Sequence, residues 1–264
     1  MRFRYRTCHN WHMTYFLEKL PIKLDTFNRQ ILNKLGYQLD PFQQNANLRG
    51  FIQKLIGLKI PISTIYDVGA ERGNWTRMVQ EMLGTKTNFY LFEPNTKYNS
   101  DLRKIGGSFY NFLLGDEIIN EVNFFSLGET GDSIYKENSV KYANVLPMQI
   151  RQLTLDYLIF NKGFPVPDLL KLDTQGSELK ILQGSLRFLN EVKVIVIELT
   201  INQLNNGSPL IGEVIEFLSE NNFIPVHLTE IHMLSSVLAQ IDIAFMNREL
   251  FRNIYGHGGF DTHL

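Results

Sequence analysis

Acidic side chains lie at or just beyond the ends of five short apolar segments in this 264-residue sequence. The acids are Asp67, Glu93, Asp116, Asp173 and Glu198, and their segments are 64–68, 88–92, 109–114, 168–172 and 192–197. We predict that these segments are strands of one doubly wound sheet, in which ligands bind beyond the carboxyl ends. The five carboxylates then meet at one edge of the sheet and form a polar site.

A glycine turn follows the first of these segments. Gly69 and Gly73 let the backbone turn tightly and approach a ligand closely. Glu93 lies 26 residues after Asp67, where a carboxylate can grip a ribose diol. A dinucleotide site prefers Gly-x-Gly-x-x-Gly, whereas this turn reads Asp-x-Gly-x-x-x-Gly. The spacing therefore favours S-adenosylmethionine over NAD.

Seven residues are predicted to bind this cofactor. Asp67 would act through water or the turn backbone on its amino acid portion, and Asp116 would accept a hydrogen bond from its adenine amino group. The full set is Asp67, Gly69, Ala70, Gly73, Glu93, Pro94 and Asp116.

The elements that position these residues alternate between strand and helix from residue 63 onward. Continuous apolar strands separated by helices indicate a parallel sheet covered on both faces. Segments 223–228 and 241–246 are predicted to add a terminal antiparallel pair, and 122–155 to form an inserted β-ribbon. We therefore predict an α/β fold with a doubly wound, mostly parallel, seven-stranded, Rossmann-like sheet.

The chain is expected to have three parts. Residues 1–60 form an N-terminal helical extension, with apolar residues at helical spacing and a further helix from about 47 to 57. Residues 61–250 form the cofactor-binding domain, and 251–264 a C-terminal tail.

Three stretches of this domain resemble the FkbM-type methyltransferases, a branch of the class I S-adenosylmethionine-dependent enzymes. They are Tyr66–Thr76, the triplet Phe92-Glu93-Pro94, and Leu170–Leu179, which is similar to the family signature K-I-D-V-E-G-x-E. Glu71 stands where the first motif often has Asn, and Gln175 replaces the usual Glu of the signature. The resemblance covers roughly residues 63–246 and implies methyl transfer to a hydroxyl oxygen.

A hydroxyl is a poor nucleophile at neutral pH, so a general base should lie close to it. Asp173 is the first candidate, followed by Glu178 and Glu198. His232, in the polar connection before the last strand, is another. No metal is assigned, although a divalent cation held by Asp173, Glu178 and Glu198 stays an open alternative.

Net charge, the length of apolar runs and the cysteine content limit the kinds of partner and setting that we expect. A net charge of −1 and a pI near 6.6 argue against a nucleic-acid partner, because proteins that bind nucleic acid usually carry an excess of basic residues. No apolar run approaches the ~20 residues of a membrane span, and the lone Cys8 suits a reducing, cytoplasmic setting. We expect a small-molecule or glycan acceptor, and a homodimer stays an open alternative. The open alternatives are a non-catalytic S-adenosylmethionine-binding module and an NAD-dependent oxidoreductase.

Overall fold

The computed structural model describes residues 47–84, 86–128, 131–234 and 236–256. The helix predicted at about 47–57 is confirmed as α4 (Leu48–Gly57), which begins where the Asn47 side chain accepts a hydrogen bond from the Gly50 amide. The helices predicted before it lie outside the described residues. None of the described helices combines the length and apolar character needed to cross a lipid bilayer.

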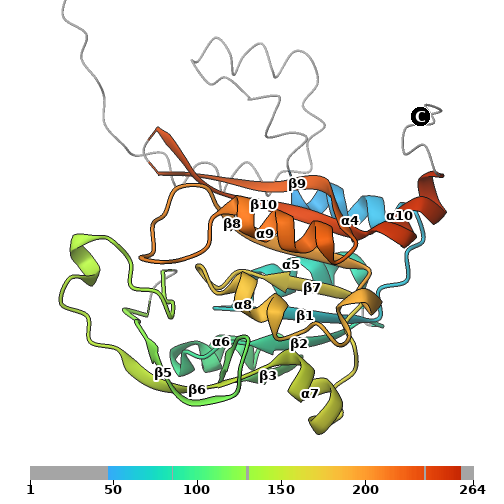
Figure 1. Ribbon diagram of the computed structural model, residues 1–264. Coiled ribbons are helices and arrows are strands. Elements are labelled where there is room, and N and C mark those ends of the chain that lie inside the picture. Colours follow the sequence, from blue (N-terminus) through green and yellow to red (C-terminus); the bar gives the residue numbers. More distant parts are fainter. Residues whose placement is uncertain (1–46, 85, 129–130, 235, 257–264) are drawn as a thin grey trace, which may run out of the picture. The chain divides into compact units, whose positions relative to one another are not determined.

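A seven-stranded sheet forms the centre of the described chain (Figure 1). In spatial order its strands are β3 (Ser108–Tyr110), β2 (Asn88–Phe92), β1 (Thr64–Val68), β7 (Leu169–Leu172), β8 (Val194–Thr200), β10 (Val237–Asn247) and β9 (Phe223–Leu234). The first five run parallel, and β10 is antiparallel to both of its neighbours. The predicted mostly parallel sheet with a terminal antiparallel pair is thus confirmed.

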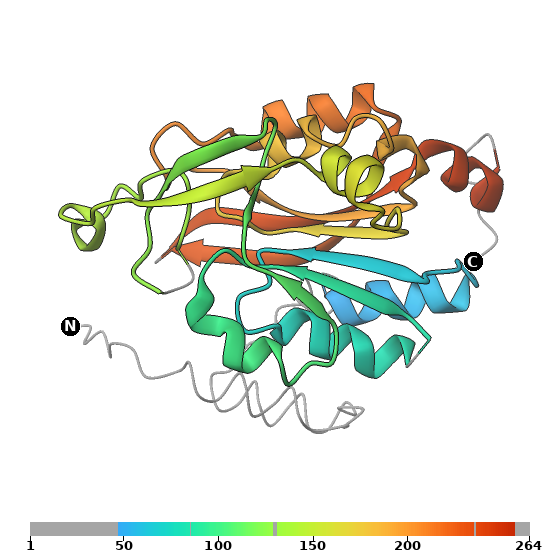
Figure 2. The same cartoon turned by 90° about the horizontal axis from the view of Figure 1, so that it is seen from below.

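Helices cover both faces of this sheet (Figure 2). One face carries α4, α5 (Asn74–Leu83), α6 (Asn99–Leu102) and α10 (Arg248–Tyr255), and the other carries α7 (Leu155–Lys162), α8 (Glu178–Gln183) and α9 (Ile211–Glu220). In β8, Ile195 and Ile197 pack into one core while Val194 and Val196 pack into the other. Burial on both faces explains why the strand reads as an unbroken apolar run.

The prediction of one strand over 109–114 is wrong. The segment divides into β3 in the main sheet and β4 (Leu113–Leu114), which pairs with β6 (Met148–Leu153) in a second sheet. Between them, the Asn111 side chain donates a hydrogen bond to the carbonyl oxygen of Glu93, and Phe112 packs beside Phe92 and Tyr110. The apolar pattern hides the break because residues on both sides of it enter one aromatic cluster.

The predicted ribbon in the insertion is confirmed and enlarged. β5 (Ile119–Phe124) pairs antiparallel with β6, and β4 completes a three-stranded sheet. Short 3-10 helices interrupt the remaining loops at η1 (Thr96–Tyr98), η2 (Val140–Tyr142) and η3 (Leu189–Glu191).

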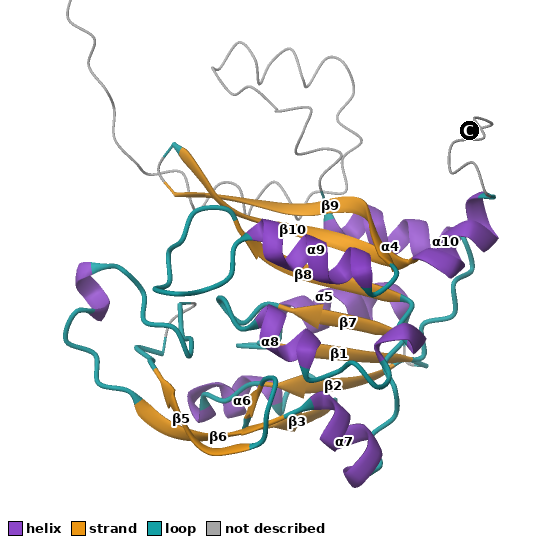
Figure 3. Cartoon of the chain, viewed as in Figure 1, coloured by secondary structure: helices purple, strands orange, loops and turns teal. Residues whose placement is uncertain are grey.

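The terminal hairpin is longer than predicted, as Figure 3 shows. The connection expected to be polar loop is itself paired strand, so His232 lies in β9 opposite Gln240. Register shifts at three points of the β9–β10 pair disturb the alternation of apolar and polar residues. One of these shifts, between Leu238 and Gln240, lies in the stretch that was predicted to be the connection.

Candidate active site

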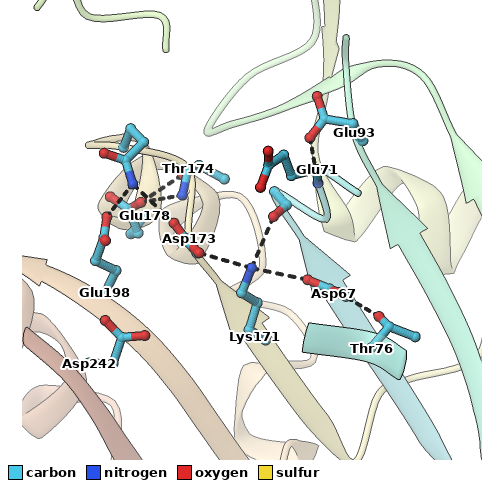
Figure 4. Close-up of polar contacts among 12 residues, drawn as sticks. Asp67, Glu71, Thr76, Glu93, Lys171, Asp173, Thr174, Glu178, Glu198 and Asp242 are labelled. Carbon is cyan, nitrogen blue, oxygen red and sulfur yellow. Dashed lines mark hydrogen bonds and ion pairs between the residues drawn. The ribbon is translucent and has the colours of Figure 1, made fainter. Parts of the chain in front are cut away.

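A buried ammonium group connects the ends of β1 and β7 (Figure 4). Lys171 Nζ lies 3.1 Å from Asp67 Oδ1 and 3.2 Å from Asp173 Oδ2, and it donates a 3.0 Å hydrogen bond to the Gly69 carbonyl. Burial by itself would lower the pKa of Lys171, but Asp173 and Asp67 raise it above its ordinary value. Lys171 is therefore a permanent cation beneath the glycine turn.

Asp67 has no exposed surface, and its second oxygen accepts a 2.5 Å hydrogen bond from the Thr76 hydroxyl at the start of α5. Its partners are thus Lys171 and Thr76, so it can influence a ligand only through them or through the turn. The sequence left the direction of the Lys171 side chain open. A lysine inside an otherwise apolar run was the signal available in the sequence, and the structure adds that it lies opposite Asp67 in register.

The glycine turn is held against two neighbouring strand ends. Gly69 and Ala70 donate their amides to the Phe92 carbonyl at the end of β2. Gly69 has φ +76°, and a Cβ there would lie 1.7 Å from the Asp173 carbonyl oxygen on the other side. Only glycine fits this position, because both the conformation and the space exclude a side chain.

Glu93 directly follows β2 beside this turn and is only 6% exposed. Its two oxygens accept hydrogen bonds from the Glu71 amide at 2.9 Å and the Asn95 amide at 2.8 Å. Burial raises the pKa of Glu93 to about 7, against the lowering effect of these two amides. Pro94, half-buried, continues the chain toward η1.

The insertion is tied to this end of β2 by a polar cluster that sequence reasoning missed. Asp132 accepts hydrogen bonds from the Asn95 side chain at 2.8 Å and the Ser126 hydroxyl at 2.6 Å. Asn95 therefore connects the loop carrying Glu93 to the insertion.

The loop after β7 is organised around Glu178. This buried carboxylate accepts hydrogen bonds from the amide and hydroxyl of Thr174, at 2.6 and 2.9 Å, and from the Gly176 amide at 2.9 Å. Burial raises its pKa above the ordinary value. The geometry makes Glu178 a part of the loop's own framework, in contrast to the proton-transfer role predicted for it.

Asp173 and Glu198 are joined through Gln175. The Gln175 amide donates to Asp173 Oδ1 at 3.1 Å and to Glu198 Oε2 at 2.7 Å, and Gln240 donates to the same Glu198 oxygen at 2.7 Å. Asp173 keeps 35% of its side chain exposed, whereas Glu198 is 6% exposed. Burial, followed by the charges of Asp173 and other nearby acids, raises the pKa of Glu198 well above its ordinary value.

His232 and Asp242 complete the group at the far side. His232 Nε2 lies 3.0 Å from Asp242 Oδ1 and 3.9 Å from Glu198 Oε1. The hydrogen bond to Asp242 chiefly raises the pKa of His232. Sequence reasoning missed Asp242, although a charged residue within the apolar run 241–246 is unusual enough to be a signal.

Asp116 does not follow a strand of the main sheet as predicted. It lies after β4 of the small sheet, and its carboxylate pairs with Lys180 at 2.8 Å. Four of the five predicted acids therefore share the carboxyl edge of the main sheet, and Asp116 belongs to the other sheet because the chain breaks after β3.

A family model and a curated relative match parts of this chain. The family model described as the Methyltransferase FkbM domain matches residues 67–225. Hexuronic acid methyltransferase AglP of Haloferax volcanii is 23% identical over 141 residues, which are 51% of this chain and 55% of that protein. The chain thus spans about half the length of this curated relative.

Among solved structures, methyltransferase FkbM from Methylobacillus flagellatus KT has a TM-score of 0.45 at 15% identity, covering 69% of this chain and 43% of that one. A putative O-methyltransferase from Klebsiella pneumoniae has a TM-score of 0.46 at 12% identity, covering 89% and 95%.

Proposed function

This chain belongs to the FkbM family of methyltransferases, and we propose that it transfers a methyl group from S-adenosylmethionine to a hydroxyl oxygen of a sugar, glycan or secondary metabolite. The observation that carries the proposal is that the glycine turn, Glu93 and the partly exposed Asp173 meet at one sheet edge. Lys171 joins the turn to Asp173, and the Glu71 amide joins the turn to Glu93. The hexuronic acid named for the relative from Haloferax volcanii supports a sugar acceptor.

The proposed cofactor site lies around the glycine turn. Each Glu93 oxygen accepts one amide hydrogen and keeps further acceptor capacity, which suits the two hydroxyls of a ribose. Gly69, Ala70 and Gly73 would bring backbone close to the cofactor, and Pro94 would border it. Asp67 acts by fixing Lys171 and the turn. We leave Asp116 out of this site, because its carboxylate pairs with Lys180.

The cofactor supplies an activated methyl group on its sulfonium; the protein must orient the acceptor and remove its proton. We assign proton removal to Asp173, whose carboxylate is partly exposed and held by Lys171 and Gln175. His232, also partly exposed and oriented by Asp242, is the second candidate. Glu178 and Glu198 are positioning residues, since one holds the loop after β7 and the other anchors Gln175.

Two measurements test this proposal. Titration calorimetry of the full chain should show binding of S-adenosylhomocysteine and none of NAD; absence of the former would overturn the proposal. Transfer of a labelled methyl group should then occur to at least one member of a panel of free sugars, lipid-linked sugars, polysaccharides and polyketides. Cofactor binding without transfer to any of them would favour the non-catalytic module.

Replacement of Glu93 should weaken the cofactor site. Glu93→Ala is expected to raise the Kd for S-adenosylhomocysteine by about tenfold or more, because charge-assisted hydrogen bonds to the ribose are lost. Calorimetry measures the effect, and Glu220→Gln, which changes an exposed residue, serves as the control. An unchanged Kd in Glu93→Ala would remove Glu93 from the site.

Cofactor affinity should also depend on pH through Glu93. With a pKa of about 7 in the free protein, the carboxylate prevails above pH 7 and the carboxyl below it. Since ribose hydroxyls donate to the charged form, the Kd should rise as the pH falls below 7, approaching tenfold per pH unit. Glu93→Gln, which does not titrate, should show little dependence between pH 8 and 6. A steep dependence that persists in Glu93→Gln would contradict this assignment.

A further inference from the structure

Three potential ligand atoms converge from three neighbouring strands, beside the loop that follows β7. Glu198 on β8 lies opposite Asp242 on β10, and His232 reaches them from β9. One oxygen or nitrogen from each lies within 4.8 Å of the others, with 3.0 Å between His232 and Asp242 and 3.9 Å between His232 and Glu198. Ligands bonded to one cation at ~2.0–2.2 Å lie about this far apart.

We propose that Glu198, His232 and Asp242 form a binding site for a divalent transition-metal cation. The three side chains stand on paired strands, so their separation is set by the sheet rather than by a loop. Binding of the cation does not require the proposed function. A role of the bound cation in orienting the hydroxyls of the methyl acceptor, in contrast, rests on the proposed function.

The hydrogen bonding of Glu198 points to a missing positive partner. Its Oε2 accepts both glutamine amides, from Gln175 and Gln240. Within the part of the chain that the structure describes, Oε1 accepts no hydrogen bond, although the side chain is 6% exposed and this oxygen faces His232 and Asp242. Oε1 is thus the oxygen of Glu198 that is available to a cation, on a side chain with little access to solvent. The two amides fix the carboxylate so that Oε1 points into the cluster.

The surrounding charge favours a cation as well. Asp173, Asp242 and Glu178 all act on Glu198 with negative charge. Lys171 acts on Glu198 with positive charge, but its ammonium group is already engaged by Asp67 and Asp173. A divalent ion would offset this surplus at the point where the carboxylates of Glu198 and Asp242 converge.

The chemical types of the three ligands indicate which metal ions the site would prefer. One imidazole and two carboxylates suit manganese, iron, cobalt or zinc better than magnesium or calcium, which prefer oxygen ligands throughout. Three protein ligands leave coordination positions for outside oxygens, such as neighbouring hydroxyls of a sugar. The earlier alternative of Asp173, Glu178 and Glu198 fits less well, since Glu178 is committed to its loop and Asp173 to Lys171.

Manganese provides a direct test. The full chain, freed of metal by a chelator, should bind one Mn²⁺, seen as loss of the free-ion signal in electron paramagnetic resonance. Asp242→Asn and His232→Asn should each weaken binding at least tenfold. Glu230→Gln removes a charge opposite Asp242 without removing a ligand, so it should change the Kd by less than about threefold.

Failure of the chain to bind Mn²⁺ would overturn the site. So would an affinity for Mn²⁺ in Asp242→Asn and His232→Asn equal to that of the unaltered chain. Thermal unfolding of each variant verifies folding, and Glu198→Gln replaces any variant that does not fold. Calorimetry with S-adenosylhomocysteine on the same samples separates the two proposals: Mn²⁺ binding without cofactor binding would retain the metal site and reject the methyl-transfer site.

Discussion

Asp173→Asn is expected to lower turnover by about 10²- to 10⁴-fold, the usual contribution of a general base. The amide cannot accept the acceptor's proton, yet it keeps the shape of the side chain. Lys171 retains Asp67 and the Gly69 carbonyl as partners, so the glycine turn should keep its position. The Kd for S-adenosylhomocysteine should therefore change by less than about threefold.

Single-turnover transfer at saturating S-adenosylmethionine measures this effect, with calorimetry of the product cofactor beside it. Asp156→Asn is a matched control. Asp156 lies in the first turn of α7, away from the site, and its carboxylate accepts a hydrogen bond from the Arg187 backbone amide. If Asp173→Asn abolished cofactor binding but left turnover at saturation unchanged, the division of roles between Glu93 and Asp173 would be wrong.

Lys171→Met should have the largest effect on stability. The substitution fills the space of the aliphatic chain but leaves Asp67, which has no exposed surface, without its cation. Removing one partner of a buried ion pair typically lowers the free energy of unfolding by about 3–5 kcal/mol. Urea unfolding followed by circular dichroism should show this loss as a lower midpoint.

Lys180→Met is the control for this prediction. It breaks a pair with Asp116 in which both side chains are partly exposed, and it should cost less than about 1 kcal/mol. Adding Asp67→Asn to Lys171→Met should recover part of the loss, since the uncompensated buried charge is then gone. Equal losses of unfolding free energy in Lys171→Met and Lys180→Met would show that the buried Asp67–Lys171 pair contributes no more to stability than the partly exposed Asp116–Lys180 pair.

Much of the fold follows from local patterns in the sequence. Strands buried on both faces read as apolar runs, and the turn at Gly69 needs a residue that tolerates a positive φ. The break between β3 and β4 is not visible, because Phe112 and Tyr110 enter the same aromatic cluster on both sides of it. That break removed Asp116 from the main sheet edge.

The sequence by itself determined the doubly wound sheet, the glycine turn and the carboxylates at the ends of the strands, because strand periodicity and backbone conformation are local properties. Only the tertiary structure decided which groups those carboxylates meet. Strand register turned Lys171 toward Asp67, loop geometry committed Glu178 to Thr174, and the long hairpin brought His232 and Asp242 to Glu198. Lys171 and Asp67, and Glu198 with His232 and Asp242, are far apart in sequence, so pairing between strands sets their distances. Glu178 and Thr174 are only four residues apart, but the conformation of the loop, which no periodic pattern reveals, brings them together.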